Sequence, residues 1–120
     1  NRPIPVFGDG RQKRDFTYID DIADGTLRCL DTEGYEIFNL GSDSPVELMY
    51  VINLIEKHLG KKAEIKWLPM HPADITATWA DITKTKDRLN WVPTTMIEKG
   101  IESCINWYLE NRDFVINLKD

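Results

Sequence analysis

The sequence is poor in the features that define secreted scaffolds and membrane proteins. Its 120 residues include two cysteines, Cys29 and Cys104, which have neither the spacing of a metal site nor the density of a disulfide framework. No apolar run approaches the ~20 residues of a membrane span, and no signal peptide is visible. From these absences we expect a reducing, cytoplasmic location and no membrane association.

Signatures of nucleotide binding and of catalysis are also missing. There is no G-x-x-x-x-G-K-[ST] loop, and Gly8-Asp9-Gly10 has only the first two glycines of a G-x-G-x-x-G fingerprint. No Tyr is followed four positions later by Lys, and no Ser, His and acid arrangement indicates nucleophilic catalysis. Two distant histidines without cysteine partners do not form a metal site. We therefore expect no catalytic, cofactor-binding or metal-binding residue in this segment.

Basic residues are fewer than acidic ones: the chain has 15 Lys and Arg and 20 Asp and Glu, which gives a net charge of −5. An acidic chain is a poor general partner for nucleic acids. Hydrophobic residues make up 42% of the chain, which is enough for one modest core in a single domain. Because the chain begins at Asn1, just before a strand-like stretch, we expect a domain cut from a longer protein.

Hydrophobic periodicity and turn residues predict an α/β fold, a small α+β-like lobe with short strands and about four helices. Strands are expected at residues 4–7, 14–18, 35–41 and 63–68, with a loop over 69–78. Helices are expected from 20–21 to about 30, from 44 to 60, over 83–89 and from 95 to about 108. Capping boxes at Ser44–Glu47 and Thr95–Glu98 are expected to start two of them. The C-terminal tail has no clear pattern.

A basic cluster near the start of the chain is a candidate anion site. Arg14 is the strongest candidate, because it leads a strand-like segment and its guanidinium can contact two phosphate oxygens at once. The alternative is that these charges are solvated and that Arg14 pairs with an aspartate at position 15, 20 or 21. The cluster comprises Arg2, Arg11, Lys13 and Arg14, against Asp9.

An aromatic residue and a polar loop are further candidates for ligand contact. Phe7 lies beside the glycine turn, where its ring could stack on a nucleobase, or it could simply pack in the core. His71 and Asp74 form a polar pair in an irregular loop, and loops on a rigid scaffold often contact ligands. His71 could donate a hydrogen bond to phosphate, or it could be an exposed loop histidine.

A series of segments resembles the C-terminal part of extended short-chain dehydrogenase/reductases that act on nucleotide sugars. The resemblance covers nearly the whole chain in order, and within the family it is most similar to UDP-glucuronate 4-epimerases. The segments that carry it are residues 6–10, 14–21, 38–41, 68–74, 80–84 and 89–95.

The resemblance implies the architecture and the roles of the candidate residues. In that family an N-terminal Rossmann domain binds NAD and carries the catalytic Tyr-x-x-x-Lys pair, and a smaller lobe binds the nucleotide half of the substrate. Residues 1–120 would be this single UDP-sugar-binding lobe, with the Rossmann domain absent from the chain. Arg14 would bind the diphosphate, Phe7 would pack on the uracil, and His71 and Asp74 would reach the phosphate and ribose.

The implied activity of the full-length protein is NAD-dependent 4-epimerisation of a UDP-sugar, with UDP-glucuronate and UDP-galacturonate as the first candidates. A nucleotide-sugar 4,6-dehydratase or a UDP-glucuronate decarboxylase is an alternative, because the deciding residues would lie upstream. A non-enzymatic nucleotide-binding or interaction module is a third. The segment alone is expected to be inactive, and an apolar patch left exposed on it could drive homodimer formation.

Overall fold

The structure, a computed structural model, describes residues 2–70 and 72–118, which form five short strands and five helices. This confirms the predicted α/β class, and the additional helix lies in the tail that has no clear sequence pattern. Along the chain the elements are β1 (Ile4–Phe7), β2 (Lys13–Arg14), α1 (Ile19–Cys29), β3 (Val46–Glu47), α2 (Leu48–Leu59), β4 (Ile65–Leu68), β5 (Ala77–Thr78), α3 (Thr83–Leu89), α4 (Ile97–Glu110) and α5 (Arg112–Asn117).

A parallel pair of strands, β1 and β4, forms one end of the molecule. Ile4 lies opposite Ile65 and Phe7 opposite Leu68, and both strands fall within segments that the sequence predicts as strands. Val6 is buried, whereas the other three residues of β1 are exposed. Pro5 is tolerated in β1 because this strand has only one partner strand.

A second sheet has the order β3-β2-β5, with β2 antiparallel to β3 and parallel to β5. The predicted strand over 14–18 is therefore wrong beyond Arg14, and the predicted loop over 69–78 contains β5. The chain leaves the sheet after Arg14 because the Asp15 side chain takes hydrogen bonds from neighbouring loops in place of ladder bonds.

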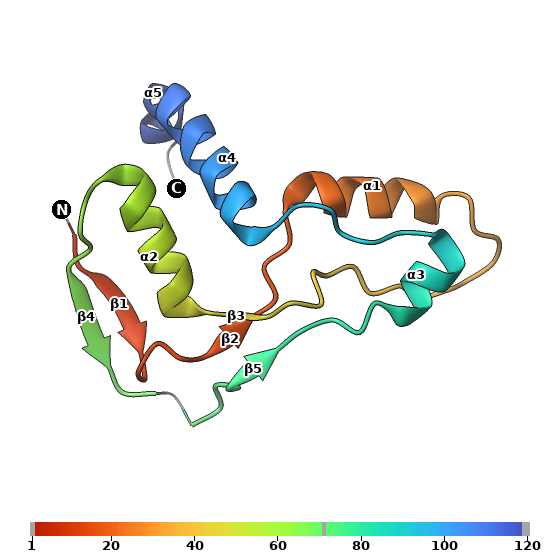
Figure 1. The fold of residues 1–120 in the computed structure, drawn as a ribbon, viewed down its shortest axis with the longest axis horizontal. Coiled ribbons are helices and arrows are strands. Elements are labelled where there is room, and N and C mark those ends of the chain that lie inside the picture. The colour runs from red at the N-terminus through yellow and green to blue at the C-terminus, as the bar shows by residue number, and fades with distance from the viewer. Residues whose placement is uncertain (1, 71, 119–120) are drawn as a thin grey trace.

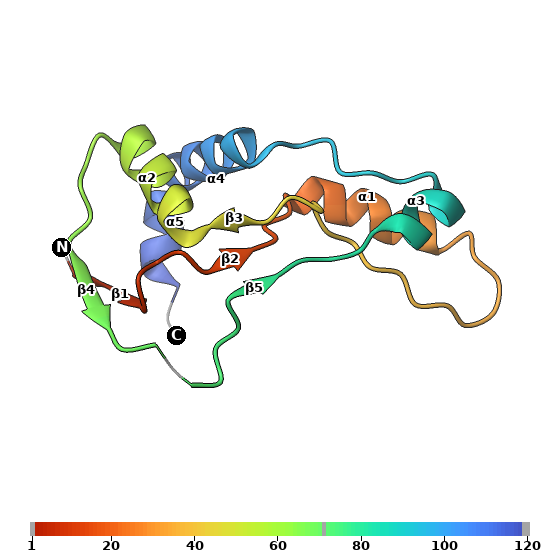
Figure 2. The same ribbon diagram turned by 60° about the horizontal axis from the view of Figure 1, so that its bottom comes forward.

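The three-stranded sheet lies between the two ends of an open molecule (Figures 1 and 2). β1, β4, α2, α4 and α5 lie at one end, and α1 and α3 lie at the other. The Cα radius of gyration is 17.0 Å, whereas a compact domain of this length has a radius of about 14 Å.

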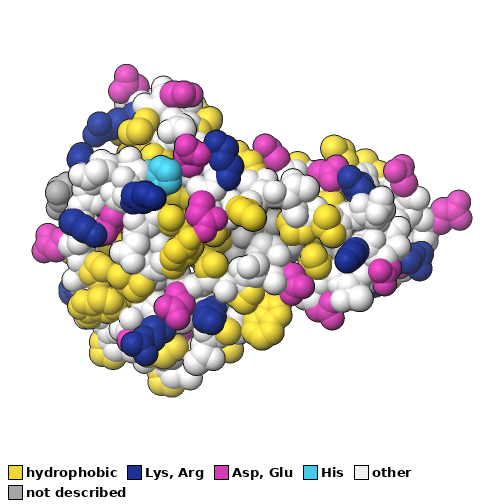
Figure 3. All heavy atoms as spheres, viewed as in Figure 1, with side chains coloured by type: hydrophobic (Ala, Val, Ile, Leu, Met, Phe, Trp, Pro, Cys, Tyr) yellow, Lys and Arg dark blue, Asp and Glu magenta, His cyan; other side chains and the backbone are white. Residues whose placement is uncertain are grey.

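Few large side chains are buried in this open arrangement. Hydrophobic side chains gather over the β1–β4 end and around the middle of the face shown in Figure 3. Cys104 is exposed although it follows the apolar spacing of its helix, and both cysteines are free thiols. The buried hydrophobic residues of the described chain are Val6, Val51, Ile52, Ile82, Trp91 and Ile105.

The segment at residues 35–41 is extended but is not the buried strand that the sequence predicts. Tyr35 is 88% exposed, and among the described residues this segment has no partner strand. Its backbone carbonyls instead accept side-chain hydrogen bonds from α3: Lys84 Nζ donates to Ile37 O and Thr85 Oγ1 to Asn39 O. A strand-like sequence forms no strand without a neighbouring strand to pair with.

Both predicted capping boxes are wrong. α2 begins three residues later and α4 one residue later than predicted, at N-caps Glu47 and Met96, and neither makes a side-chain capping bond. Interactions with distant segments replace the capping bonds. Glu47 pairs with β2 as part of β3, and the Thr95 amide donates to the Asp21 carboxylate. The predicted stop of α2 at Gly60 is confirmed, and this residue has the positive φ of 63° that favours glycine.

A network around Asp21 joins the first turn of α1 to residues 91–95. The buried carboxylate accepts bonds from Thr94 N (3.0 Å), Thr94 Oγ1 (2.9 Å) and Thr95 N (3.0 Å), and the indole of Trp91 donates to Asp21 O. Gly25 faces Trp91 one turn later along α1, and Trp91 is only 1% exposed.

We expect Gly25→Ala to destabilise the fold by about 1–3 kcal/mol, although alanine favours helices. The added Cβ would lie 2.7 Å from Leu40 Cδ2 and 3.0 Å from Trp91 Cε2. Urea unfolding followed by tryptophan fluorescence measures the change. The control Ala23→Gly, at an exposed site on the same helix, measures the difference in helix propensity between alanine and glycine. This difference favours alanine, whereas the steric contact at position 25 disfavours it. A stabilised Gly25→Ala variant would show that the contact is not tight.

Asp21 should make the free energy of unfolding depend on pH in acid. Burial raises the pKa of Asp21, but hydrogen bonds from Thr94 and Thr95 outweigh burial and lower it below its ordinary value of 3.8. The stabilisation is therefore complete above pH 3.8 and is lost as the pH falls below it.

Unfolding of the parent and Asp21→Asn over a pH series tests this dependence. The free energy of unfolding should be about 1–3 kcal/mol lower for Asp21→Asn than for the parent at neutral pH, and this difference should become smaller in acid. Asp20→Asn, at the exposed neighbouring position, should follow the parent. A gap that stays constant with pH would contradict the assignment.

Candidate functional site

Arg14 occupies the centre of the three-stranded sheet. In register it lies opposite Val46 on one side and Thr78 on the other. Its Nη1 donates to Lys13 O (2.8 Å) and Ile75 O (3.0 Å). The guanidinium is therefore oriented by backbone carbonyls, yet the side chain remains 32% exposed.

Asp74, a second predicted site residue, lies beside Arg14. Arg14 Nη2 donates to Asp74 Oδ1 at 2.8 Å, in a partly buried ion pair. The structure thus brings together two residues that are 60 positions apart. Neither predicted alternative for Arg14 holds, because its carboxylate partner is Asp74 and it is not fully solvated.

The remaining cations do not converge on Arg14. Arg11 forms an exposed ion pair with Asp9 at 3.8 Å, and Lys13 lies opposite Glu47 on β3. The basic cluster seen in the sequence is therefore divided among several acidic neighbours. Arg14 alone of these cations lines the groove described next.

A shallow groove of about 520 Å³ runs past Arg14. Its walls come from three parts of the chain: the end of β2, residues 39–41, and the end of β5 with the residues that follow it. The lining residues are Arg14, Asp15, Phe16, Asn39, Leu40, Gly41, Thr78, Trp79 and Ala80. A groove with one oriented cation and aromatic walls can hold an anion attached to a flat or apolar group.

The Asp15 carboxylate connects the walls of this groove. Oδ1 accepts from Ser42 N (2.9 Å) and from Ser42 Oγ, and Oδ2 accepts from Ala80 N (3.0 Å) and Asp43 N (3.3 Å). Burial raises the pKa of Asp15, but these hydrogen bonds outweigh burial and lower its pKa below the ordinary value. Asp15 is therefore an ionised carboxylate whose hydrogen bonds are made within the protein.

Phe7, a third predicted site residue, lies in a different sheet from Arg14. Phe7 ends β1 in the other sheet, and it is 45% exposed, so it is not a core residue. The Gln12 side chain donates to Phe7 O and spans the intervening turn. His71 lies outside the described residues.

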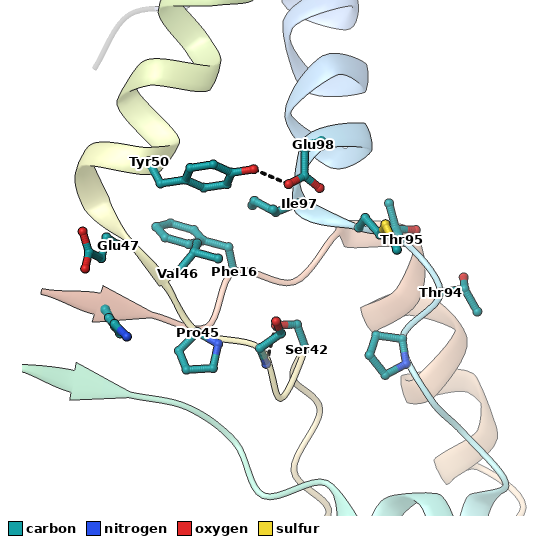
Figure 4. A pocket seen from close by; sticks show the side chains of 14 residues that line it. Phe16, Ser42, Pro45, Val46, Glu47, Tyr50, Thr94, Thr95, Ile97 and Glu98 are labelled. Atoms are coloured by element: carbon teal, nitrogen blue, oxygen red, sulfur yellow. Dashed lines mark hydrogen bonds between the residues drawn. The ribbon is translucent and has the colours of Figure 1, made fainter. Parts of the chain in front are cut away.

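A second cavity of about 750 Å³ lies between α2, α4 and the sheet (Figure 4). Phe16 points into it, between Val46 and Tyr50. The Tyr50 hydroxyl donates to Glu98 and joins the first turns of α2 and α4. This bond raises the pKa of Tyr50 and lowers that of Glu98. Phe7, Arg14 and Asp74 do not line this cavity.

The described residues do not fit a dinucleotide cofactor. The Gly8–Gly10 turn joins two strands, whereas a dinucleotide-binding turn leads into the N-terminus of a helix. The space in front of Gly10 is filled, since a Cβ there would lie 2.5 Å from Met49 Cγ. Nor do any three His, Cys, Asp or Glu side chains in the described part of the chain gather to hold a metal ion.

Comparison with known proteins identifies the family. The family model described as GDP-mannose 4,6 dehydratase matches residues 1–104. The chain belongs to this family. The resemblance to extended short-chain dehydrogenase/reductases that act on nucleotide sugars is thereby confirmed.

Individual members of the family include UDP-glucuronate 4-epimerases. The chain is 48% identical over 119 residues to one from Thermodesulfobacterium geofontis, covering 98% of this chain and 37% of the relative. It is 38% identical over 126 residues to UDP-glucuronate 4-epimerase 1 of Arabidopsis thaliana, covering 90% and 29%. The chain therefore spans 37% and 29% of the lengths of these two curated relatives.

A solved family structure has the same fold. This is UDP-glucuronic acid 4-epimerase from Bacillus cereus in complex with UDP-glucuronic acid and NAD. It superposes with a TM-score of 0.81 at 36% identity and covers 91% of this chain and 36% of that one. Among the residues described for our chain, no helix has the length and apolar character needed to cross a bilayer.

Several groove residues are not found by sequence reasoning. Asp15, Phe16, Thr78 and Trp79 line the groove beside Arg14, but none of them was a candidate. The signal for Asp15 and Phe16 was their position directly after Arg14. Thr78 and Trp79 had no such signal, because a loop was expected where β5 forms.

Proposed function

We propose that the chain is the nucleotide-sugar-binding portion of an NAD-dependent UDP-sugar 4-epimerase that interconverts UDP-glucuronate and UDP-galacturonate. The observation that carries the proposal is the 48% identity with a UDP-glucuronate 4-epimerase along almost the whole chain. The oriented Arg14 in an open groove supports it, because a diphosphate needs a fixed cation.

The proposal assigns a role to each of the four site residues. Arg14 binds the diphosphate through the part of the guanidinium that is not engaged by Asp74 and the carbonyls. Asp74 orients Arg14 and reaches the ribose. Phe7 packs on the uracil with the ring face that the structure leaves exposed. His71 contacts the phosphate in this proposal. The protein thus anchors UDP at a distance from the reacting sugar carbon.

The proposal includes a partner for the lobe, a Rossmann domain that binds NAD and supplies the catalytic Tyr-x-x-x-Lys pair. Its support is the open shape of the chain and the apolar surface along α1, where Ile19, Leu27 and Leu30 are exposed. A further support is the extended segment at 35–41, which has no partner strand among the described residues. Without such a cover, the same surface would favour a homodimer.

A dehydratase is the second candidate, because the matching family model is described as GDP-mannose 4,6 dehydratase. The complete polypeptide encoded around these residues, incubated with NAD and either UDP-glucuronate or GDP-mannose, distinguishes the two. We expect UDP-galacturonate from UDP-glucuronate and no reaction of GDP-mannose, and we expect residues 1–120 alone to give no turnover. Decarboxylation of UDP-glucuronate, or dehydration of GDP-mannose, would contradict the epimerase assignment. A complete natural product of 13.9 kDa, the mass of this chain, would favour a non-enzymatic module.

Arg14→Ala should weaken UDP binding by the complete polypeptide. The loss is roughly 2–5 kcal/mol for one partner of a desolvated charge contact, and we expect the low end because part of the side chain is exposed. Calorimetry with UDP measures it. Arg11→Ala removes the same charge from an exposed pair outside the groove and is the matched control. Equal affinity in both variants would rule out the role of Arg14.

A further inference from the structure

The strands that flank Arg14 are too short to hold their own positions. β3 and β5 each have two residues, and β2 between them also has two. Each flanking strand therefore shares only one residue pair beyond the pair that contains Arg14. Such short ladders supply few hydrogen bonds, so another interaction must fix Val46 and Thr78 beside the guanidinium.

Asp15, the residue directly after Arg14, supplies that interaction on both sides. The amides of Ser42 and Asp43 lie in the segment that leads to β3, and the amide of Ala80 follows β5. Ser42 Oγ also accepts from Ser44 N (3.1 Å), which extends the network toward β3. One carboxylate thus binds the chain on both sides of the strand that carries Arg14.

The fit around this carboxylate is close. A Cβ on Gly41 would lie 2.6 Å from Asp15 Oδ2 and 2.5 Å from Ala80 Cβ. Residues 39–41 and 78–80, which form two walls of the groove, therefore meet at Asp15. Movement of this carboxylate would change the width of the groove.

We propose that Asp15 is a positioning residue, which acts through the segments around Ser42 and Ala80 to set the groove in which Arg14 meets a diphosphate. This inference rests on the proposed function. Asp15 does not bind the ligand itself, because both of its oxygens are occupied by internal donors.

The chemistry of the donors requires a carboxylate at this position. An asparagine has one acceptor oxygen and one NH₂ donor, so its nitrogen would face either the Ser42 donors or the amides of Asp43 and Ala80. One wall of the groove would then lose its partner. Asp15→Asn keeps the size of the side chain and removes this double role.

The test compares Asp15→Asn with Asp21→Asn in the complete polypeptide that carries these residues. Asp21 is the matched control, because it is a carboxylate that accepts three hydrogen bonds from Thr94 and Thr95 away from the groove. Calorimetry with UDP gives the dissociation constants, urea unfolding gives the stability, and amide hydrogen exchange follows Asp43 and Ala80.

Both variants should lose stability, but they should differ in ligand binding. We expect Asp15→Asn to weaken UDP binding about 10- to 100-fold, the scale of a displaced contact group. Its Asp43 and Ala80 amides should exchange faster. Asp21→Asn should bind UDP within about twofold of the parent. Unchanged UDP binding in Asp15→Asn, or an equal loss in both variants, would overturn the proposal.

A milder pair of variants covers the case in which Asp15→Asn does not fold. Ser42→Ala removes one hydroxyl donor from Asp15, and Thr94→Ala removes one from Asp21. We expect weaker UDP binding only in Ser42→Ala, and equal affinities would contradict the inference. Arg14→Ala in the same assay separates the two proposals: normal UDP binding by this variant would rule out the diphosphate-binding role of Arg14, on which the inference rests, whereas a loss confined to Arg14→Ala would defeat only the role of Asp15.

Discussion

The central sheet depends on a carboxylate that takes the place of strand pairing. Three strands of two residues cannot form a stable sheet through their ladder bonds alone. Asp15 accepts hydrogen bonds from loops on both sides of β2, and its lowered pKa shows that these bonds outweigh the cost of burial. Because this sheet lies between the two ends of the molecule, these contacts act together with the Asp21 network to place the ends relative to each other.

Much of the hydrophobic side-chain surface of the chain is exposed, because few hydrophobic side chains are buried. Six hydrophobic side chains are buried among the described residues, while aromatic and aliphatic side chains on α1, α4 and α5 stay in contact with solvent. The large radius of gyration and the segment at 35–41, which has no partner strand among the described residues, belong to the same open arrangement.

The Arg14 guanidinium is oriented by groups of the protein and not by the anion that it is proposed to bind. Two carbonyls and Asp74 hold the guanidinium, so little side-chain freedom remains to be lost when an anion binds. The negative charge of Asp74 offsets part of the positive charge, and an exposed edge is left in the groove. Such an arrangement favours selectivity for a ligand of defined shape over attraction of anions in general.

Much of the local structure follows from the sequence. The apolar periodicity of α2, its stop at Gly60 and the strand at Ile4–Phe7 depend on neighbours along the chain, and each is predicted correctly. The candidates Arg14 and Asp74 could also be proposed, from charge and from a polar loop. Their ion pair could not be foreseen, because it requires β5 to align beside β2 across 60 residues.

Tertiary structure decided where α2 and α4 begin and whether residues 35–41 form a strand. Ser44 and Thr95 have the residue types of helix caps, but pairing of β3 with β2 and the bond from Thr95 to Asp21 moved both helix starts. Residues 35–41 have the alternation of a strand, yet a strand exists only where another strand supplies its hydrogen bonds. Composition and residue spacing determine which secondary structures each segment can adopt. Segments distant in the chain decide which of them it does adopt, because every buried backbone N–H and C=O group needs a hydrogen-bond partner in the folded protein.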